Sequence, residues 1–255
     1  MAELTPMLRQ YNEIKEKHPN ELLFFRLGDF YELFGEDAKK ASAILDIVLT
    51  ARHKGSSNEM PMCGIPHHAL ENYLAKLLRA GQRVAICDQV GDASLPGIVK
   101  REVVQVVTPG TTLVNSTLNN KSNNFIAALT FQKNTWGLAI ADLTTGEFRV
   151  AEVLDLSLLK NEIYRFDFSE IIINQELFND TRYKEFISSL SNVNVFQLSV
   201  FQKAYALLIK QFKVKNLQSF GVEELPIGIE AAGLLLGYLK DTQKSDLSHI
   251  TRIQR

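Results

Sequence analysis

The residues best suited to chemistry in this chain of 255 residues form the run Gly28-Asp29-Phe30-Tyr31-Glu32-Leu33-Phe34. Gly-Asp is a strong turn dipeptide and an apolar stretch over 22–27 precedes it, so we expect two strands joined by a tight turn. Side chains alternate between the faces of a strand, so Phe30 and Glu32 share one face and Tyr31 lies on the other. A ring that can stack beside a carboxylate that can hydrogen-bond is suited to probing an exposed base.

The same residues also permit a purely structural interpretation. Most aromatic side chains in strands are buried, so Phe30 and Phe34 would belong to a hydrophobic core and Glu32 would be a solvated charge at a sheet edge. This segment by itself favours the structural interpretation.

The elements that must position the hairpin indicate a mixed α/β domain. Thr5 caps a helix that has Pro6 at its first position and ends near Lys17. The β-branched run 103–107 favours a strand buried on both faces. The other expected elements are strands over 22–27, 30–34, 47–50, 83–87 and 102–107, helices over 36–45 and 68–80, and a long loop over 52–66.

A second domain follows a stretch rich in Asn, Ser and Thr. Residues 111–124 predict a linker after a first domain of residues 1–110, and the second domain covers residues 125–245. It opens with an antiparallel meander and then alternates helix and strand, the order expected of a ribonuclease-H-like α/β fold. Residues 246–255 have no closing element and are interpreted as the start of a further, truncated unit. The expected elements are strands over 125–131, 136–143, 147–153, 170–174 and 193–197, and helices over 156–165, 180–189, 199–213 and 228–240.

Composition and charge narrow the class of protein. Apolar residues make up 45% and charged residues 22% of the chain, as in ordinary globular proteins. Because no apolar run is long enough to span a membrane and no secretory signal is present, we expect a cytoplasmic protein. Cys63 and Cys87 are too few and too far apart for a disulfide framework or a zinc site, which predicts two buried free thiols.

The charge balance bears on nucleic-acid binding. Residues 1–115 carry 13 Lys and Arg against 14 Asp and Glu, and the whole chain has a net charge of −1. Nucleic-acid binders usually show a basic excess. We therefore expect DNA binding by this chain alone to be weak or undetectable.

Further segments join the run 28–34 in a distinctive set. They are Asp46-Ile47-Val48-Leu49-Thr50, residues 60–69, 71–77, 84–87 and 107–111, and, more loosely, Phe220-Gly221-Val222 and Lys240-Asp241-Thr242-Gln243. Together these segments resemble the bacterial MutS family of DNA mismatch repair proteins, whose Phe-x-Glu motif is similar to Phe30-Tyr31-Glu32. The resemblance covers essentially the whole chain.

The resemblance implies a function for each part. Residues 1–110 would form a mismatch-binding domain, residues 125–245 a connector domain, and residues 246–255 the start of a core or lever domain. Phe30 would enter the minor groove of mismatched double-stranded DNA and stack on a mispaired base, and Glu32 would hydrogen-bond that base. The connector domain would link to a MutL-like partner and to the ATPase core of a homodimeric full-length protein associated with the bacterial nucleoid.

Cofactors implied by the resemblance belong to parts outside this chain. ATP and Mg²⁺ would bind the ATPase of the full-length protein. The sequence holds no Gly-x-x-x-x-Gly-Lys-Ser/Thr phosphate loop. We therefore expect no cofactor and no ATP hydrolysis in this chain.

Weaker candidates for DNA contact adjoin the predicted loop and a predicted strand. The basic residues among them would touch phosphates, which position DNA without reading its sequence, and the apolar ones would buttress the ring. Solvated surface charge and core packing stay open as alternatives. These candidates are Arg52, Lys54, Pro61, Met62, Lys100 and Arg101.

Two other patterns suggest metals. Asp142 stands where ribonuclease-H-like nucleases hold a metal-binding Asp, but two-metal chemistry needs several converging carboxylates, and we find no partners on the neighbouring strands. We expect Asp142 to direct a turn and keep a metal-dependent nuclease as the alternative function. His67 and His68 lack ligands at metal-site spacing, which indicates a helix-start or packing role. A pure protein-interaction fragment is a third interpretation.

Overall fold

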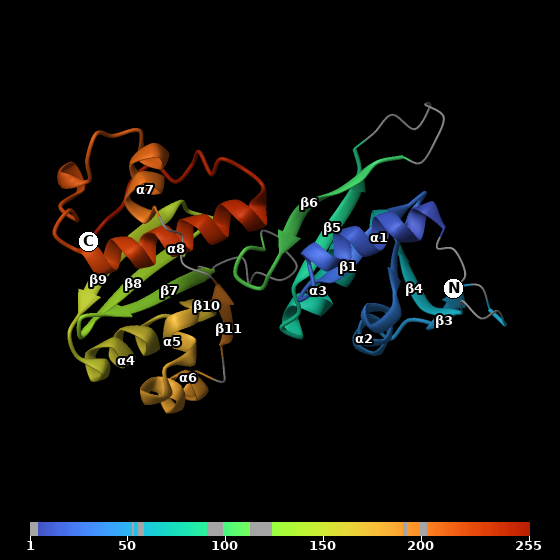
Figure 1. Ribbon diagram of the computed structural model, residues 1–255, viewed down its shortest axis with the longest axis horizontal. Helices are drawn as coiled ribbons and strands as arrows, with labels where there is room; N and C mark the ends of the chain where they lie inside the picture. Colours follow the sequence, from blue (N-terminus) through green and yellow to red (C-terminus); the bar gives the residue numbers. More distant parts are fainter. Residues whose placement is uncertain are drawn as a thin grey trace. The chain divides into compact units, whose positions relative to one another are not determined.

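The computed structural model describes residues 5–52, 54–55, 59–90, 99–112, 124–190, 193–198 and 203–255 (Figure 1). The chain divides into two compact units, residues 1–117 and 118–255. Most of the expected linker, residues 113–123, lies outside the described residues. Among the described residues, no helix is long and apolar enough to cross a membrane.

The first unit is built on a six-stranded mixed sheet. Its strand order is β3-β4-β2-β1-β5-β6, and only the β1–β5 pair is parallel among its neighbours. The strands are β1 (Leu22–Leu27), β2 (Phe30–Phe34), β3 (Thr50–Arg52), β4 (Met60–Pro66), β5 (Val84–Gln89) and β6 (Arg101–Val107).

Helices cover both faces of this sheet. Helix α1 (Pro6–Lys17), capped by Thr5, packs on one face, where the ring of Tyr11 lies 4.9 Å from that of Phe34. Helices α2 (Gly35–Leu45) and α3 (Leu70–Arg79) cover the other face, where Tyr31 and Leu33 are buried. The α/β class expected from the sequence is confirmed, and Cys63 and Cys87 are buried free thiols as expected.

The strand expected over 47–50 is wrong, because β3 begins at Thr50. Asp46 ends α2 with a left-handed φ of 55°, and the Ile47 N–H donates to the Ser42 carbonyl at 3.2 Å. The backbone of Ile47 therefore completes the end of the helix instead of joining a sheet.

The loop expected over 52–66 is wrong in its second half, where β4 forms. Pro61, Gly64 and Pro66 are typical of loops when only the local sequence is considered. Pairing with β2 on one side and β3 on the other stabilises this strand despite its composition.

The expectation that 103–107 is buried on both faces is also wrong, because β6 is the edge of the sheet and Val104 is 38% exposed.

The second unit holds a five-stranded sheet in the order β11-β10-β7-β8-β9. The expected antiparallel meander is confirmed by β7, β8 and β9, and β10 and β11 extend it with parallel pairings. The strands are β7 (Phe125–Gln132), β8 (Thr135–Asp142), β9 (Glu147–Val153), β10 (Phe168–Asn174) and β11 (Asn194–Leu198).

Two groups of helices sandwich this second sheet (Figure 1). Helices α7 (Ala204–Phe212) and α8 (Pro226–Gln243) pack on one face. Helices α4 (Leu156–Arg165), α5 (Gln175–Asn179) and α6 (Lys184–Ser189) pack on the other. The helix expected over 180–189 is instead a 3₁₀ turn (Thr181–Tyr183) followed by α6, because the Asp180 carboxylate accepts from the Arg182 N–H at 3.0 Å and sets a turn there.

Helix α8 approaches the sheet backbone at its start. A Cβ added at Gly137 would lie 2.1 Å from the Ile227 carbonyl oxygen, so only glycine fits there. The Glu152 carboxylate accepts from the N–H groups of Ile227 and Gly228 at 2.6 and 3.1 Å. This carboxylate satisfies free donors at the helix N-terminus and complements its positive dipole.

The C-terminal segment forms no helix or strand after α8 among the described residues, as expected, but it packs on the second unit. Leu247, Ile250 and Ile253 are buried in the hydrophobic cluster that also contains residues of α8. The Val150 N–H donates to the Gln254 carbonyl at 2.8 Å, which pairs the segment with the free edge of β9. These described residues therefore close one edge of the sheet.

Candidate nucleic-acid interface

The β1–β2 hairpin presents its tip through a two-residue turn. Leu27 pairs with Phe30, which leaves Gly28 and Asp29 as the turn. Gly28 has a φ of +57°, a backbone conformation that favours glycine, and glycine at the first turn position fits a type II′ hairpin. The turn predicted from Gly-Asp is confirmed, and it places Phe30 at the first position of β2.

The predicted alternation of faces along β2 is confirmed. Phe30 is 48% exposed, whereas Tyr31 is 1% exposed on the opposite face. Phe34 shares the face of Phe30 but is 2% exposed, because α1 covers that end of the strand. One face of a single strand thus carries a core phenylalanine at one end and a free ring at the other, with Glu32 between them.

Gly64 on β4 lies directly across from Glu32. A Cβ at this position would stand 3.6 Å from the Glu32 Cγ and 3.9 Å from the Phe30 Cδ1. The missing side chain therefore leaves the backbone open beside both functional groups. Sequence reasoning did not single out Gly64, although glycine within a strand is a known sign of close approach by a ligand or another backbone.

Glu32 is half-buried, and among the described residues Arg52 is the charged neighbour that acts on it. Its side chain is 22% exposed, and its Oε2 lies 3.4 Å from Nη1 of Arg52 on β3. Burial raises the pKa of Glu32, and the positive charge of Arg52 opposes that rise. The carboxyl group therefore takes up a proton more readily than an exposed glutamate does.

The opposite face of β2 anchors the hairpin tip. The Tyr31 hydroxyl donates to Asp88 Oδ2 at 3.0 Å, and its ring lies 5.6 Å from that of His67. The His67 N–H donates to the Asp29 carbonyl at 2.8 Å. His67 also begins the 3₁₀ turn before α3, so its expected helix-start and packing role is confirmed.

The weaker candidates fall into different environments. Arg52 contacts Glu32, and Pro61 and Met62 are half-buried on β4, next to β2. Lys54 is exposed. Lys100 is also exposed and forms an ion pair with Glu102, so the structure does not gather all six residues around the hairpin.

Arg101 lies inside the first unit. It is 8% exposed, and its Nε donates to the Arg26 carbonyl at 2.6 Å. Its guanidinium also lies 5.1 Å from the centre of the Phe25 ring. These contacts hold the start of β6 to β1, and they argue against Arg101 as a phosphate contact.

Asp142 directs a turn, as the sequence predicted. Its Oδ1 accepts from the N–H and the hydroxyl of Thr144 at 2.8 and 2.6 Å. Over the part of the chain that the structure describes, no group of three His, Cys, Asp or Glu side chains is placed to hold a metal ion. Nothing in this arrangement favours the nuclease alternative.

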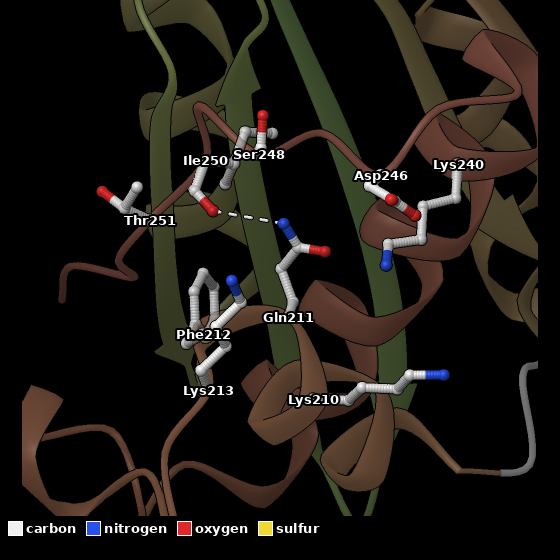
Figure 2. Close-up of a pocket in the computed structure, with 9 residues that line it drawn as sticks. All are labelled: Lys210, Gln211, Phe212, Lys213, Lys240, Asp246, Ser248, Ile250 and Thr251. Atoms are coloured by element: carbon white, nitrogen blue, oxygen red, sulfur yellow. Dashed lines mark hydrogen bonds between the residues drawn. The ribbon is translucent and has the colours of Figure 1, made fainter.

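A hollow of about 380 Å³ lies in the second unit between the ends of α7 and α8 and the C-terminal segment (Figure 2). Gln211 crosses it and donates to the carbonyls of Leu247 and Ile250 at 2.9 and 3.2 Å. Its lysines stand at helix C-termini, where a positive charge complements the dipole. Local structure thus explains its polar lining, which consists of Lys210, Gln211, Lys213, Lys240, Asp246, Ser248 and Thr251.

Comparison with known proteins agrees with the division into two units. Residues 5–116 match the family described as MutS domain I, and residues 124–251 match MutS domain II. The chain is 44% identical over 261 aligned residues to DNA mismatch repair protein MutS of Lachnoclostridium phytofermentans, an alignment that covers 99% of this chain and 28% of that protein. It is 43% identical to MutS of Halothermothrix orenii (99% and 29% covered) and 41% identical to MutS of Desulfatibacillum aliphaticivorans (98% and 29%). The chain thus spans less than a third of the length of these relatives.

Proposed function

The chain belongs to the MutS family of DNA mismatch repair proteins, and from that premise we propose that it recognises mispaired bases in double-stranded DNA. The observation that carries this proposal is the exposed ring of Phe30 beside the half-buried carboxyl group of Glu32, on one face of a strand whose backbone is paired on both sides. The ring is exposed for stacking, and the Glu32 carboxyl group, which contacts Arg52 through Oε2, can hydrogen-bond through Oε1.

In this proposal Phe30 acts as a wedge from the minor groove. An apolar wedge unstacks a base step and kinks the duplex, at a cost of a few kcal/mol. A mismatched step is already poorly stacked and deforms more easily, so the cost is lower there than at a paired step. Stacking on the ring returns about 1–3 kcal/mol and is tolerant of base identity. Selectivity then comes mainly from how easily the DNA deforms.

Glu32 supplies the second part of the recognition. An ionised carboxylate only accepts hydrogen bonds, so it must be protonated to donate to an acceptor atom such as a purine N7. Burial already raises the pKa of Glu32, and nearby phosphates would raise it further. On matched DNA, where no base is displaced, the ionised carboxylate is repelled by the phosphates, which disfavours binding.

The second unit is proposed to act as the connector. It would link the recognition unit to a MutL-like partner and to the ATPase core of a homodimer that works on bacterial chromosomal DNA. The ATP and Mg²⁺ of that ATPase would bind outside residues 1–255. The near-neutral charge of this chain supplies few phosphate contacts, which is consistent with clamping by other domains.

The test is a titration against matched and mismatched duplexes of otherwise identical sequence. Because the chain alone is expected to bind DNA weakly, the titration uses a chimera in which residues 1–255 are joined to the remaining domains of the Lachnoclostridium phytofermentans relative. We expect the chimera to prefer the mismatched duplex, and Glu32→Gln to raise its affinity for matched DNA and narrow the preference. Equal affinity of the unaltered chimera for both duplexes would contradict mismatch recognition, and weaker matched binding by Glu32→Gln would contradict the role given to Glu32.

A further inference from the structure

Arg52 reaches Glu32 from another strand through a loose contact. The Nη1–Oε2 distance of 3.4 Å exceeds the roughly 2.7–2.9 Å of a strong charge-assisted hydrogen bond. Both side chains are partly exposed, at 32% for Arg52 and 22% for Glu32. The Arg52 guanidinium also lies 5.7 Å from the centre of the buried Phe34 ring, which holds it near the site independently of Glu32. A partner held in this way is easily exchanged.

The strands on either side of Glu32 place no titratable side chain opposite it. Its neighbour on β1 is Phe25, and its neighbour on β4 is Gly64. Among the described residues, Arg52 is the charged group that acts on the Glu32 carboxyl group. Burial favours the neutral form of Glu32 and the Arg52 guanidinium, 3.4 Å from Oε2, favours the ionised form, so moving Arg52 away would shift Glu32 further toward the neutral form.

Building on the proposed mismatch recognition, we propose that Arg52 is an exchangeable counter-ion that pairs with Glu32 in the free protein and transfers to a DNA phosphate when a mismatch is bound. The exchange is balanced by the uptake of one proton from solvent. Arg52 stays protonated and moves its positive charge from the carboxylate to the phosphate, while Glu32 takes one proton from solvent and donates it in a hydrogen bond to the displaced base. Arg52 is thus a positioning residue, and Glu32 makes the contact with the base.

This exchange would couple the phosphate contact to the state of the base. Matched DNA offers a phosphate but no displaced base, so Glu32 would stay ionised and retain Arg52. Transfer of Arg52 would then leave an unpaired carboxylate among phosphates, which is unfavourable. The mismatched duplex removes that obstacle, because neutral Glu32 no longer needs a counter-ion.

The first experiment needs no DNA and uses the chain itself. The ¹³C signal of the Glu32 carboxyl carbon is followed by NMR through a pH titration of the unaltered chain and of Arg52→Gln. We expect the midpoint to rise in Arg52→Gln, because the opposing positive charge is gone. The matched control is Lys39→Gln, which removes a cation from an exposed pair with Glu36 on α2 and should leave the midpoint unchanged. An unchanged midpoint in Arg52→Gln overturns the proposal.

The second experiment is a double-mutant cycle in the chimera, with Arg52→Gln, Glu32→Gln and both together. We expect Arg52→Gln to lower the ratio of mismatched to matched affinity by roughly threefold or more when Glu32 is present, and to change that ratio little in the Glu32→Gln background. A simple phosphate contact would instead weaken both duplexes equally in both backgrounds, and that result overturns the exchange while leaving mismatch recognition intact. If the unaltered chimera shows no mismatch preference, the proposed function itself fails and this inference fails with it.

Discussion

Replacing Phe30 and Phe34 by alanine, one at a time, separates a probing ring from a structural one. Both are phenylalanines on the same face of β2, but Phe30 is 48% exposed and Phe34 is 2% exposed. Truncating a buried phenylalanine costs about 3–5 kcal/mol, because it loses the transfer free energy and leaves a cavity. Phe30 has buried about half of its surface and leaves no enclosed cavity, so Phe30→Ala should lower the free energy of unfolding by about 1 kcal/mol.

The order of the two variants should reverse in DNA binding. Loss of base stacking on Phe30 removes about 1–3 kcal/mol, which is about 5- to 150-fold in affinity for the mismatched duplex. Matched DNA should be affected little. Unfolding in urea is read from resolved amide signals of the first unit in the isolated chain, and binding is read by fluorescence titration of the chimera with both duplexes.

Two results would refute this reasoning. If Phe30→Ala destabilises the first unit as much as Phe34→Ala does, Phe30 is a core residue and its ring is not available for stacking on a base. If a folded Phe30→Ala chimera still prefers the mismatched duplex, the wedge lies elsewhere. The comparison within one strand controls for strand propensity and for the chemistry of the side chain.

Three further predictions concern substitutions of single residues. Gly64→Ala should keep stability within about 1 kcal/mol, since the added Cβ makes ordinary contacts of 3.4 Å or more, but it should weaken mismatch binding in the chimera by filling the space beside the wedge; unchanged binding would show that no base approaches there. Burial by itself would raise the pKa of Glu21, but the contacts with His18 and Arg83 outweigh burial and hold this pKa below 4.5. Ionised Glu21 therefore stabilises the fold above about pH 4.5, and this stabilisation is lost as the pH falls further. Glu21→Gln should therefore cost about 1.5–3 kcal/mol in urea unfolding at pH 7 and converge on the unaltered chain in acid, whereas a constant difference would contradict the charge argument. Gly137→Ala should destabilise the second unit by about 3 kcal/mol or more, because the new Cβ would lie 2.1 Å from a main-chain oxygen of α8; a normal unfolding midpoint would refute that close approach.

Local patterns were sufficient for the hairpin. The Gly-Asp turn and the period of two along Phe30-Tyr31-Glu32 predicted which side chains share a face, and the structure confirms it. The pattern did not predict that Phe30 is exposed and Phe34 is buried, because this difference depends on which part of the sheet α1 covers. The contact between Glu32 and Arg52 depends on β3, which was predicted over 47–50 but forms over Thr50–Arg52.

Long-range pairing explains most of what the sequence did not predict. Residues 60–66 contain two prolines and a glycine, and only the strands on both sides make them a strand. The run 103–107 has the composition of a central strand, but β6 lies at the edge of the sheet. The position of a strand within a sheet is set by the pairing of other segments and cannot be predicted from the composition of the strand itself. The pairing of Gln254 with the edge of β9 is similarly non-local, because it joins residues about one hundred positions apart.

The double pairing of β2 has a consequence for the entropy of binding. Because Phe30 pairs with Leu27 on one side and Pro66 on the other, its backbone is fixed before any ligand arrives. Inserting the ring then restricts only side-chain torsions, at about 0.5–1.5 kcal/mol. A disordered loop carrying the same residues would lose about 1–2 kcal/mol for each residue it had to order. Ordering even two or three such residues would cancel the free energy that one stacked base returns, so the wedge role proposed for Phe30 depends on a strand that folding has already immobilised.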